Sequence, residues 1–398
     1  MKVLIAGAGI GGLCLAQGLL RQGVDVAVYE RDAALDSRGQ GYRLHLNAGP
    51  ALHSCLSPDL YELCVATAGQ PSTSVTVVTK KLRRLRQLNV GSPADPFDPA
   101  TLSTSVNRHT FREILAARLD GVVSYGKACT AFEQDGDGVR VFFADRSCAE
   151  GEVLVGADGV GSPVRRQYLP HAQVTETGSL CVYGRTPLTA ESRPLIPDYL
   201  WRGFTAVAGA GVGMATGVLD FREEPASAAR RIAPDVRLTD VPGYLMWALT
   251  GPAGRFASDP RGALSGSPVA LHRVAADTIR DWHQDLRRLV ELATVEETTL
   301  VPIRTSVPVG PWPASRVTLL GDAIHAMSPA RGSGANTALR DSALLAAELG
   351  AAARGDKPLL SAVADYERMM ADYGFAAVRA ARQQEGARKG WLRRLVNG

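Results

Sequence analysis

Cysteines are few in this sequence, and their spacing excludes two kinds of site. No two of the six form a Cys-x-x-Cys pair, so neither a zinc site nor a dithiol redox motif is indicated. Scattered thiols of this kind are typical of a protein from a reducing compartment. The six are Cys14, Cys55, Cys64, Cys129, Cys148 and Cys181.

Long apolar runs and charge of one sign are also scarce. Val3 to Leu20 is uncharged, as in a signal peptide or a membrane helix, but five glycines interrupt it, which favours a phosphate-binding loop. We therefore expect a cytoplasmic protein without a membrane span. The net charge is only +4, and the basic run from Lys80 to Arg86 is typical of a solvated face. Binding to nucleic acid is not indicated, because a large basic field with stacking aromatic groups is missing.

What the sequence does contain is an alternation of strands and helices that predicts an α/β fold. Lys2 to Ala6 and Val24 to Tyr29 have the apolar, β-branched character of buried parallel strands, and Ile10 to Gln22 between them has helical spacing. Such a strand–helix–strand unit begins a Rossmann-like domain. Further helices are predicted over 47–65, 108–119, 281–293, 335–353 and 360–388.

The middle of the chain differs in composition. Residues 71–100 and 171–285 contain many Gly, Pro and Thr residues and show little helical period, which predicts a β-rich unit. We therefore expect two domains. One is a discontinuous Rossmann-like domain of residues 1–70, 101–170 and 286–398 with long C-terminal helices, and the other is the inserted β-rich domain of residues 71–100 and 171–285.

A glycine motif follows the first strand. Gly7, Gly9 and Gly12 match Gly-x-Gly-x-x-Gly, and Ile10 and Gly11 lie between them where the helix begins. The first glycine allows a tight turn, the second lets backbone N–H groups approach a pyrophosphate, and the third lets helix and strand pack closely. The positive end of the helix dipole then faces the phosphates.

An acidic residue completes this motif. Glu30 ends the second strand, at the spacing of a carboxylate that binds a ribose hydroxyl, and Arg31 follows it. The glycine motif and Glu30 together predict a dinucleotide site that includes both residues.

A second candidate loop lies near the C-terminal end. Asp322 comes directly after the predicted strand Arg316 to Leu320, where α/β folds meet their ligands. The helix that begins near Ala335 would offer free N–H donors and the positive end of its dipole. That combination suits an anionic cofactor group.

Three separated motifs together resemble one enzyme family. The glycine motif, the turn Ala157-Asp158-Gly159 and the loop from Gly321 occur in the order found in the class A, single-component FAD-dependent aromatic monooxygenases, the para-hydroxybenzoate hydroxylase family. The resemblance covers nearly the whole chain. It is nearest to the small actinobacterial-type hydroxylases of polyketides and antibiotics, including the tetracycline-modifying branch.

The resemblance implies a glutathione-reductase-type FAD-binding domain and roles for individual residues. Arg108 would contact an FAD phosphate or ribose, Asp158 would support the pyrophosphate region and nicotinamide binding, and Asp322 would bond the ribityl chain. Arg43, in the loop that begins at Arg38, would contact the flavin or the nicotinamide. The loop beside the flavin ring would contain Pro329, Gly332, Gly334, Ala335 and Asn336.

The resemblance also implies a reaction. NADPH or NADH would dock transiently and reduce FAD, since only one dinucleotide fingerprint is present. O2 would then form a flavin C4a-hydroperoxide that transfers one oxygen atom to an aromatic or polyketide-like substrate held by the β-rich domain. Hydroxylation, oxidative decarboxylation and Baeyer–Villiger insertion all remain open. We expect no metal, and a monomer or a homodimer.

The sequence does not assign catalytic side chains. Candidates for the substrate pocket rest on residue type and region alone, and His325 is as well explained by a structural role. A flavin-dependent halogenase and a non-catalytic FAD protein that sequesters a small ligand remain alternatives, although the Trp-x-Trp-x-Ile-Pro string of the halogenases does not occur. The pocket candidates are His45, Tyr183, Arg185, Arg202 and His272.

Overall fold

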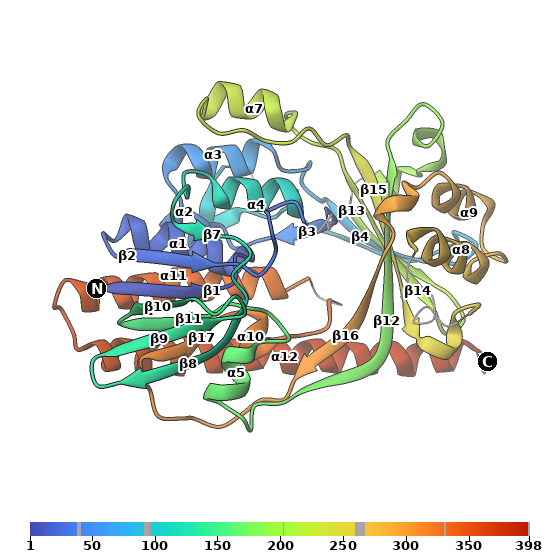
Figure 1. Cartoon of the computed structure of the whole chain (residues 1–398). Coiled ribbons are helices and arrows are strands. Elements are labelled where there is room, and N and C mark those ends of the chain that lie inside the picture. The colour runs from blue at the N-terminus through green and yellow to red at the C-terminus, as the bar shows by residue number, and fades with distance from the viewer. Residues whose placement is uncertain are drawn as a thin grey trace.

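The computed structural model describes residues 1–37, 41–90, 95, 97–201, 203–258, 267–329 and 332–396, with side chains as far as residue 384. Its helices and strands form two halves, each built on one large sheet (Figure 1). Among the described residues, no helix combines the length and the apolar character that crossing a membrane requires.

The first half is built on a parallel five-stranded sheet. Its order is β17 (Val317–Leu319), β11 (Val153–Gly156), β1 (Lys2–Ala6), β2 (Asp25–Tyr29) and β7 (Val123–Ser124). The strands β1 and β11 are almost entirely buried, as their apolar sequences predict. This sheet confirms the predicted Rossmann-like fold, and it brings the two ends of the chain together.

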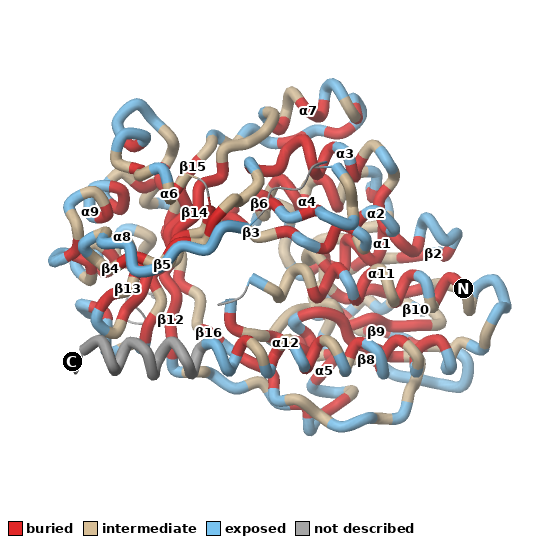
Figure 2. The backbone as a smooth tube through the Cα atoms, turned by 180° about the vertical axis from the view of Figure 1, so that it is seen from behind, coloured by how far each residue is buried: buried red, intermediate tan, exposed pale blue. Residues whose placement is uncertain are grey.

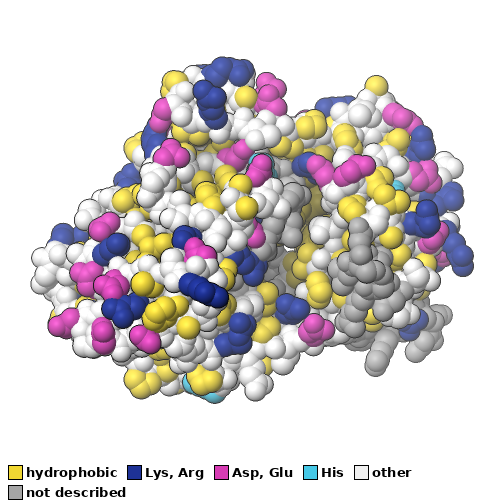
Figure 3. Space-filling model, viewed as in Figure 1, with side chains coloured by type: hydrophobic (Ala, Val, Ile, Leu, Met, Phe, Trp, Pro, Cys, Tyr) yellow, Lys and Arg dark blue, Asp and Glu magenta, His cyan; other side chains and the backbone are white. Residues whose placement is uncertain are grey.

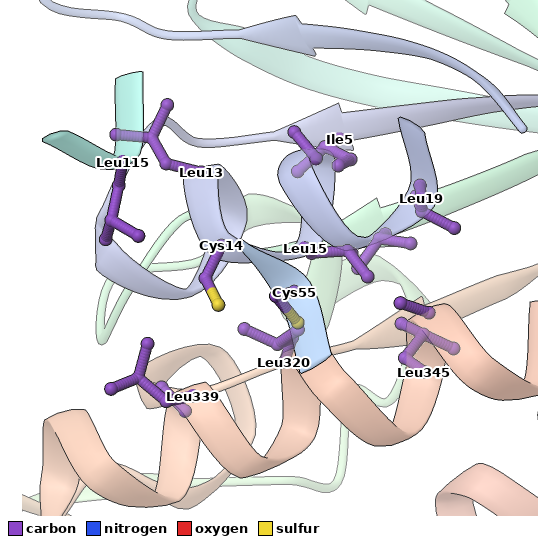
Figure 4. Close-up of a cluster of buried hydrophobic side chains, with 14 of the residues drawn as sticks. Ile5, Leu13, Cys14, Leu15, Leu19, Cys55, Leu115, Leu320, Leu339 and Leu345 are labelled. Atoms are coloured by element: carbon purple, nitrogen blue, oxygen red, sulfur yellow. The ribbon is translucent and has the colours of Figure 1, made fainter. Parts of the chain in front are cut away.

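Helices from both ends of the chain cover this sheet. The helix α1 (Ile10–Arg21) packs between the sheet and α11 (Gly334–Ala353), with Ile5, Leu15 and Leu345 among the buried side chains (Figure 4). Other elements of this half are α2 (Gly49–Cys55), α3 (Pro58–Ala66), α4 (Arg108–Ala116), α5 (Pro163–Tyr168), α10 (Asp322–His325), α12 (Leu359–Val396) and an antiparallel sheet of β8 (Cys129–Asp135), β9 (Gly138–Phe143) and β10 (Cys148–Gly151).

The second half is built on a seven-stranded sheet, and only its β13–β4 pair is parallel. One face carries the buried side chains of Trp247 and Leu249, which α8 (Pro268–Thr278) and α9 (Gln284–Glu291) cover. Figure 2 shows that the edge strand β5 is exposed along its length. The strand order is β16 (Thr299–Ser306), β12 (Val174–Pro187), β15 (Tyr244–Pro252), β14 (Gly213–Leu219), β13 (Gly203–Ala208), β4 (Ser74–Thr79) and β5 (Arg84–Asn89).

The remaining short elements lie between and around these sheets. A two-stranded ladder of β3 (Arg43–Leu46) and β6 (Thr104–Asn107) joins the halves. Within the described residues, the short helices α6 (Asp198–Trp201) and α7 (Pro225–Ile232) and several 3-10 turns are the remaining elements; the turns are Pro99–Thr101, Arg193–Leu195, Ala253–Arg255 and Val295–Glu297.

Three sequence-based expectations differ from this structure. The helix expected over 47–65 is two helices, because Pro58 begins a new one. The β-rich stretch 171–285 contains α8, whose buried Leu271, Val274 and Ala275 form a helical stripe. The strand β16 lies in the range assigned to the Rossmann-like domain but pairs with β12, so the second sheet extends to residue 306. With β16 moved to the β-rich domain, we propose the rest of the two-domain division unchanged.

Candidate functional site

In the glycine loop, one glycine has room for a Cβ atom and three do not. Gly7 has φ +111°, and a Cβ there would lie 2.4 Å from the Ala157 carbonyl oxygen. A Cβ on Gly12 would lie 2.0 Å from the Gly7 oxygen, and one on Gly11 would lie 2.4 Å from a methyl group of Leu320. A Cβ on Gly9 would meet no atom within 4 Å. Gly7, Gly11 and Gly12 therefore serve packing, while Gly9, just before Ile10 begins α1, faces open space.

Glu30 supports this loop. It is 8% exposed, and its carboxylate accepts hydrogen bonds from the Ala8 N–H at 2.8 Å and the Asp32 N–H at 3.0 Å. Each oxygen retains a lone pair, so a contact with a ribose hydroxyl stays a prediction. Arg31 is exposed beside it.

An arginine that sequence reasoning missed also holds the loop. Arg112 is 4% exposed and donates to the Ala8 carbonyl at 3.1 Å and to the Leu35 carbonyl at 3.0 Å. Burial, and then the neighbouring Arg108, lowers its pKa. The signal was its position four residues after Arg108, on the same face of α4.

Arg108 and Asp322 lie close enough for the charge of Arg108 to act on the pKa of Asp322. Arg108 is the first residue of α4, and its guanidinium carbon lies 5.5 Å from the centre of the Tyr42 ring. Its side chain forms no hydrogen bond or ion pair with the described residues. The Asp322 side chain is exposed to solvent, but many protein atoms surround its carboxyl group. The desolvation that these atoms cause raises its pKa, against the opposing effects of His325 and Arg108. Arg108 is therefore available to an anionic ligand.

Asp158 carries a buried oxygen without a partner. One carboxylate oxygen accepts from the Val164 N–H at 3.4 Å, but Oδ1 is inaccessible and has no partner among the described residues. Burial raises the pKa of Asp158. The residue lies against Gly7, because a Cβ there would be 3.0 Å from the Asp158 Cα atom. Arg165 ties this turn to α10, donating to the Ala323 carbonyl at 2.8 Å and the Val160 carbonyl at 3.1 Å.

A buried hydrogen-bond network holds the strand end before Asp322. Asp341 accepts from the Gly321 N–H at 2.9 Å, from His325 Nε2 at 2.6 Å and from the Tyr373 hydroxyl at 2.7 Å. His325 and Asp341 are both fully buried. Burial alone would lower the pKa of His325, but Asp341 outweighs it and raises the pKa. His325 is thus held by its contact with Asp341, and this supports a structural role for it.

The loop after α10 lies beside Asp322. Gly334 begins α11, and a Cβ on it would lie 3.9 Å from Asp322 Oδ1, so the positive helix end of Gly334 and Ala335 faces this carboxylate. Asn336 donates to the His45 carbonyl at 2.9 Å and accepts from the Asn47 N–H at 2.8 Å. Its amide therefore fixes the loop to β3.

Gly332 and Pro329 are the other two predicted members of this loop. Gly332 has φ +62°, a conformation that favours glycine, and Pro329 is exposed. The intervening residues 330–331 lie outside the described residues, as do Arg38 and Arg202.

Arg43 faces away from this cluster. It is 8% exposed and donates to the Val218 carbonyl at 3.2 Å and to the Ser72 hydroxyl at 3.3 Å. Burial lowers its pKa to about 10. Since β3 directs this side chain toward the seven-stranded sheet, Arg43 joins the two halves. Its contact with the flavin or the nicotinamide stays a prediction that these contacts do not support.

Two of the pocket candidates lie on the side of the sheet that faces the first half. Tyr183 stacks on Tyr42 with ring centres 5.2 Å apart, and burial raises its pKa. Arg185 pairs with Glu297 and lies over the Tyr244 ring at 5.2 Å. A small cavity lies among Tyr42, Tyr183, Arg185 and Glu297.

The two histidine candidates do not point into this cavity. His272 lies on α8 with its ring 6.4 Å from Trp247, whose side chain belongs to the opposite, helix-covered face. His45 is half-buried on β3, and burial, followed by the charge of Arg43, lowers its pKa.

Comparison with known proteins agrees with this geometry. Residues 5–64 match a family model described as an NAD(P)-binding Rossmann-like domain, and residues 272–380 match one described as an FAD-binding domain. A solved structure from Photorhabdus luminescens, described as an FAD-containing monooxygenase, has a TM-score of 0.80 and 29% identity, with 96% of this chain and 97% of that chain covered.

Two relatives show what such chains do elsewhere. The dual O-methyltransferase/FAD-dependent monooxygenase CTB3 of Cercospora beticola is 33% identical over 389 residues, which cover 92% of this chain but 44% of CTB3. The chain thus spans less than half of that relative. The FAD-dependent monooxygenase thnD of Trichoderma harzianum is 29% identical over 406 residues, 96% of this chain and 92% of thnD. By motifs, fold and relatives, the chain belongs to the family of FAD-binding monooxygenases.

Proposed function

We propose that this protein is an NAD(P)H-consuming monooxygenase that inserts one oxygen atom from O2 into an aromatic small molecule of secondary metabolism. The observation that carries this proposal is a set of unsatisfied groups around one place: the open backbone at Gly9, the buried Asp158 Oδ1 and the Arg108 guanidinium opposite Asp322. Such groups in a family with FAD-binding motifs are expected to meet a polar, anionic cofactor.

The residues would contact FAD in the order of its parts, from the pyrophosphate through the ribityl chain to the ring. The N-terminus of α1 beyond Gly9 offers backbone N–H donors to a pyrophosphate, and Arg108 offers a guanidinium. Asp322 presents a carboxylate to the hydroxyls of the ribityl chain. The N-terminal end of α11 (Gly334–Ala353) would act as a fixed dipole that favours negative charge on the cofactor ring. FAD, once reduced by a nicotinamide cofactor, supplies the chemistry that activates O2.

The substrate would lie on the sheet face that carries Tyr183. That face meets the first half through the Tyr42–Tyr183 stack, and Tyr42 also lies beneath Arg108. An aromatic ring placed there would be next to the flavin loop and shielded by apolar side chains. The name of one relative supports a substrate with a hydroxyl group, since CTB3 is described as both an O-methyltransferase and an FAD-dependent monooxygenase.

The test is substrate-stimulated oxidation of NADPH and NADH by the purified flavoprotein. We expect hydroxylated aromatic compounds to raise the rate of NAD(P)H consumption and to gain one oxygen atom by mass. A protein that keeps its FAD but responds to no member of a broad aromatic panel would contradict the proposal. Asp322→Ala, freed of FAD, serves as the control for uncatalysed oxidation.

A further inference from the structure

The edge strand β5 leaves one side of the seven-stranded sheet without a neighbour. It stands last in the strand order, and among the described residues only β4 pairs with it. All of its residues are exposed, and its outer side lies uncovered in Figure 2. Many proteins protect such an edge with proline or a covering element, because its free N–H and C=O groups can pair with another strand. β5 contains no proline.

Two residues of β5 direct their backbone groups toward this open side. The Val90 N–H, just beyond the strand, donates to the Thr73 carbonyl at 2.8 Å, so Val90 faces the β4 side. Backbone groups alternate in direction along a strand, and the bulge of this strand pair lies nearer the start of β5. Leu88 therefore faces β4 as well, while the N–H and C=O groups of Gln87 and Asn89 face outward.

Apolar side chains accompany these backbone groups. The Leu88 side chain is 48% exposed, and that of Val90 is 41% exposed. The register with β4 places Leu88 beside Val75, which is half-exposed on the same face of the sheet. Exposed apolar side chains next to unpaired backbone groups are typical of an edge that another strand extends.

The charge along the edge decides how a partner strand can lie. From Lys80 to Val90 the chain has five basic residues and no acidic one, whereas Figure 3 shows basic and acidic side chains mixed over the face that it presents. The basic residues gather toward the start of this stretch, and Arg86 is the last of them. A second copy in parallel would place arginine against arginine. An antiparallel copy places each basic end beside the uncharged end, 87–90, of the other.

We propose that two copies of this chain associate through their β5 strands, antiparallel and centred on Leu88, so that one sheet continues across both copies. Gln87 and Asn89 of each copy then exchange backbone hydrogen bonds with Asn89 and Gln87 of the other. Leu88 packs on its own counterpart, and Arg86 lies opposite Val90. The two Arg86 residues are about 14 Å apart along the ladder, beyond the screening length of about 8 Å at physiological salt. This inference concerns assembly and does not depend on the proposed reaction.

Sedimentation equilibrium of the FAD-loaded protein tests the association. Since the paired ladder is short, we expect a dissociation constant in the micromolar range and a dimer at about 100 µM. Asn89→Pro removes an outward N–H and no hydrogen bond to β4, so it should raise the dissociation constant about tenfold or more. Asn89→Ala keeps this N–H and should behave like the wild type. FAD content and melting temperature establish that each variant is folded.

Cross-linking tests the register, and it does so without a proline. In a Cys148→Ser background, which removes an exposed thiol, Leu88→Cys should form a disulfide between two copies when oxidised with diamide. Directly opposed residues of this kind have Cα atoms about 4.5 Å apart, which a disulfide can bridge. Leu85→Cys is the matched control: Leu85 is also 48% exposed. It would lie about 20 Å from its counterpart and should not form the cross-link.

Three results would each overturn the inference. They are a wild type that stays monomeric up to about 200 µM, well above the expected micromolar range, association that Asn89→Pro leaves unchanged, and equal cross-linking of Leu85→Cys and Leu88→Cys. A monomeric wild type that binds poly-L-glutamate, and loses this binding in Asn89→Pro, would assign the edge to an acidic segment of another protein in place of a second copy.

Discussion

Asp322 and Asp158 present carboxylate oxygens where the site would meet FAD. Oδ1 of Asp158 is buried without a partner, and the pKa of Asp322 is raised by the protein around it. A buried polar group without a partner costs roughly 1–3 kcal/mol, and a bound ligand that supplies a donor removes that cost. Both residues are therefore better explained by cofactor binding than by the stability of the protein alone.

Replacing Asp322 tests this explanation at one residue. Asp322→Ala should retain less FAD, with a dissociation constant raised about tenfold or more, since it removes a charge-assisted hydrogen bond. Flavin fluorescence during titration with FAD measures this directly. Undiminished FAD content in Asp322→Ala would remove Asp322 from the site.

Asp341 should act on FAD through Gly321. In Asp341→Asn the carboxylate that accepts from Gly321, His325 and Tyr373 is lost. We expect unfolding in urea to show a loss of about 3 kcal/mol, together with weaker FAD binding. Tyr373→Phe, which removes one donor and keeps the His325–Asp341 pair, should show a smaller loss of both. Equal effects in the two variants would argue against a role for the pair.

Glu367 should make stability depend on pH. It is 5% exposed, Thr318 donates to it at 2.9 Å, and burial raises its pKa to about 7 from an ordinary value of 4.5. Protonated Glu367 therefore contributes to the free energy of unfolding in full below about pH 4.5, and this contribution is lost as the pH rises through about 7. Glu367→Gln should therefore be more stable than the wild type at about pH 8, by at most about 3 kcal/mol, and the difference should shrink toward about pH 5. A difference that does not vary with pH would contradict the assignment.

At the scale of elements, the turn from β1 into α1 contains one glycine that folding requires, Gly12, and one that we expect to matter for FAD binding, Gly9. A Cβ on Gly12 would meet the Gly7 oxygen at 2.0 Å, whereas one on Gly9, at φ −75°, would meet nothing within 4 Å. Gly9→Ala should thus fold with nearly unchanged stability without FAD but bind FAD more weakly. Gly12→Ala should lower the melting temperature even without FAD. The comparison fails if Gly9→Ala destabilises the FAD-free protein as much as Gly12→Ala does.

Elements were predictable where local chemistry decides them. The glycine turn and the helix from Ile10 follow from short-range sterics and hydrophobic period, and the structure has both. The contacts of Arg112 and Arg43 were not predictable, because the direction of each side chain depends on packing between segments distant in sequence. Arg43 contacts Val218 and Ser72, and no local pattern indicates that pairing.

At the scale of the whole molecule, the two halves meet where the cofactor and the substrate would meet. Arg43 and the Tyr42–Tyr183 stack connect β3 of the first half with β12 and β14 of the second. The discontinuous FAD-binding half was predictable because its motifs occur at both ends of the chain. The register of the seven-stranded sheet was not, since it depends on hydrogen bonding among strands distant in sequence.

The central claim is that this chain transfers oxygen from O2 to an aromatic molecule. The most direct measurement is the mass of the product formed by the FAD-loaded protein with NADPH or NADH, an aromatic substrate and isotopically labelled O2. We predict one labelled oxygen atom in the product and none when FAD is absent. A product whose new oxygen comes from water, or NAD(P)H consumption that yields only hydrogen peroxide with every aromatic compound tested, would contradict the claim.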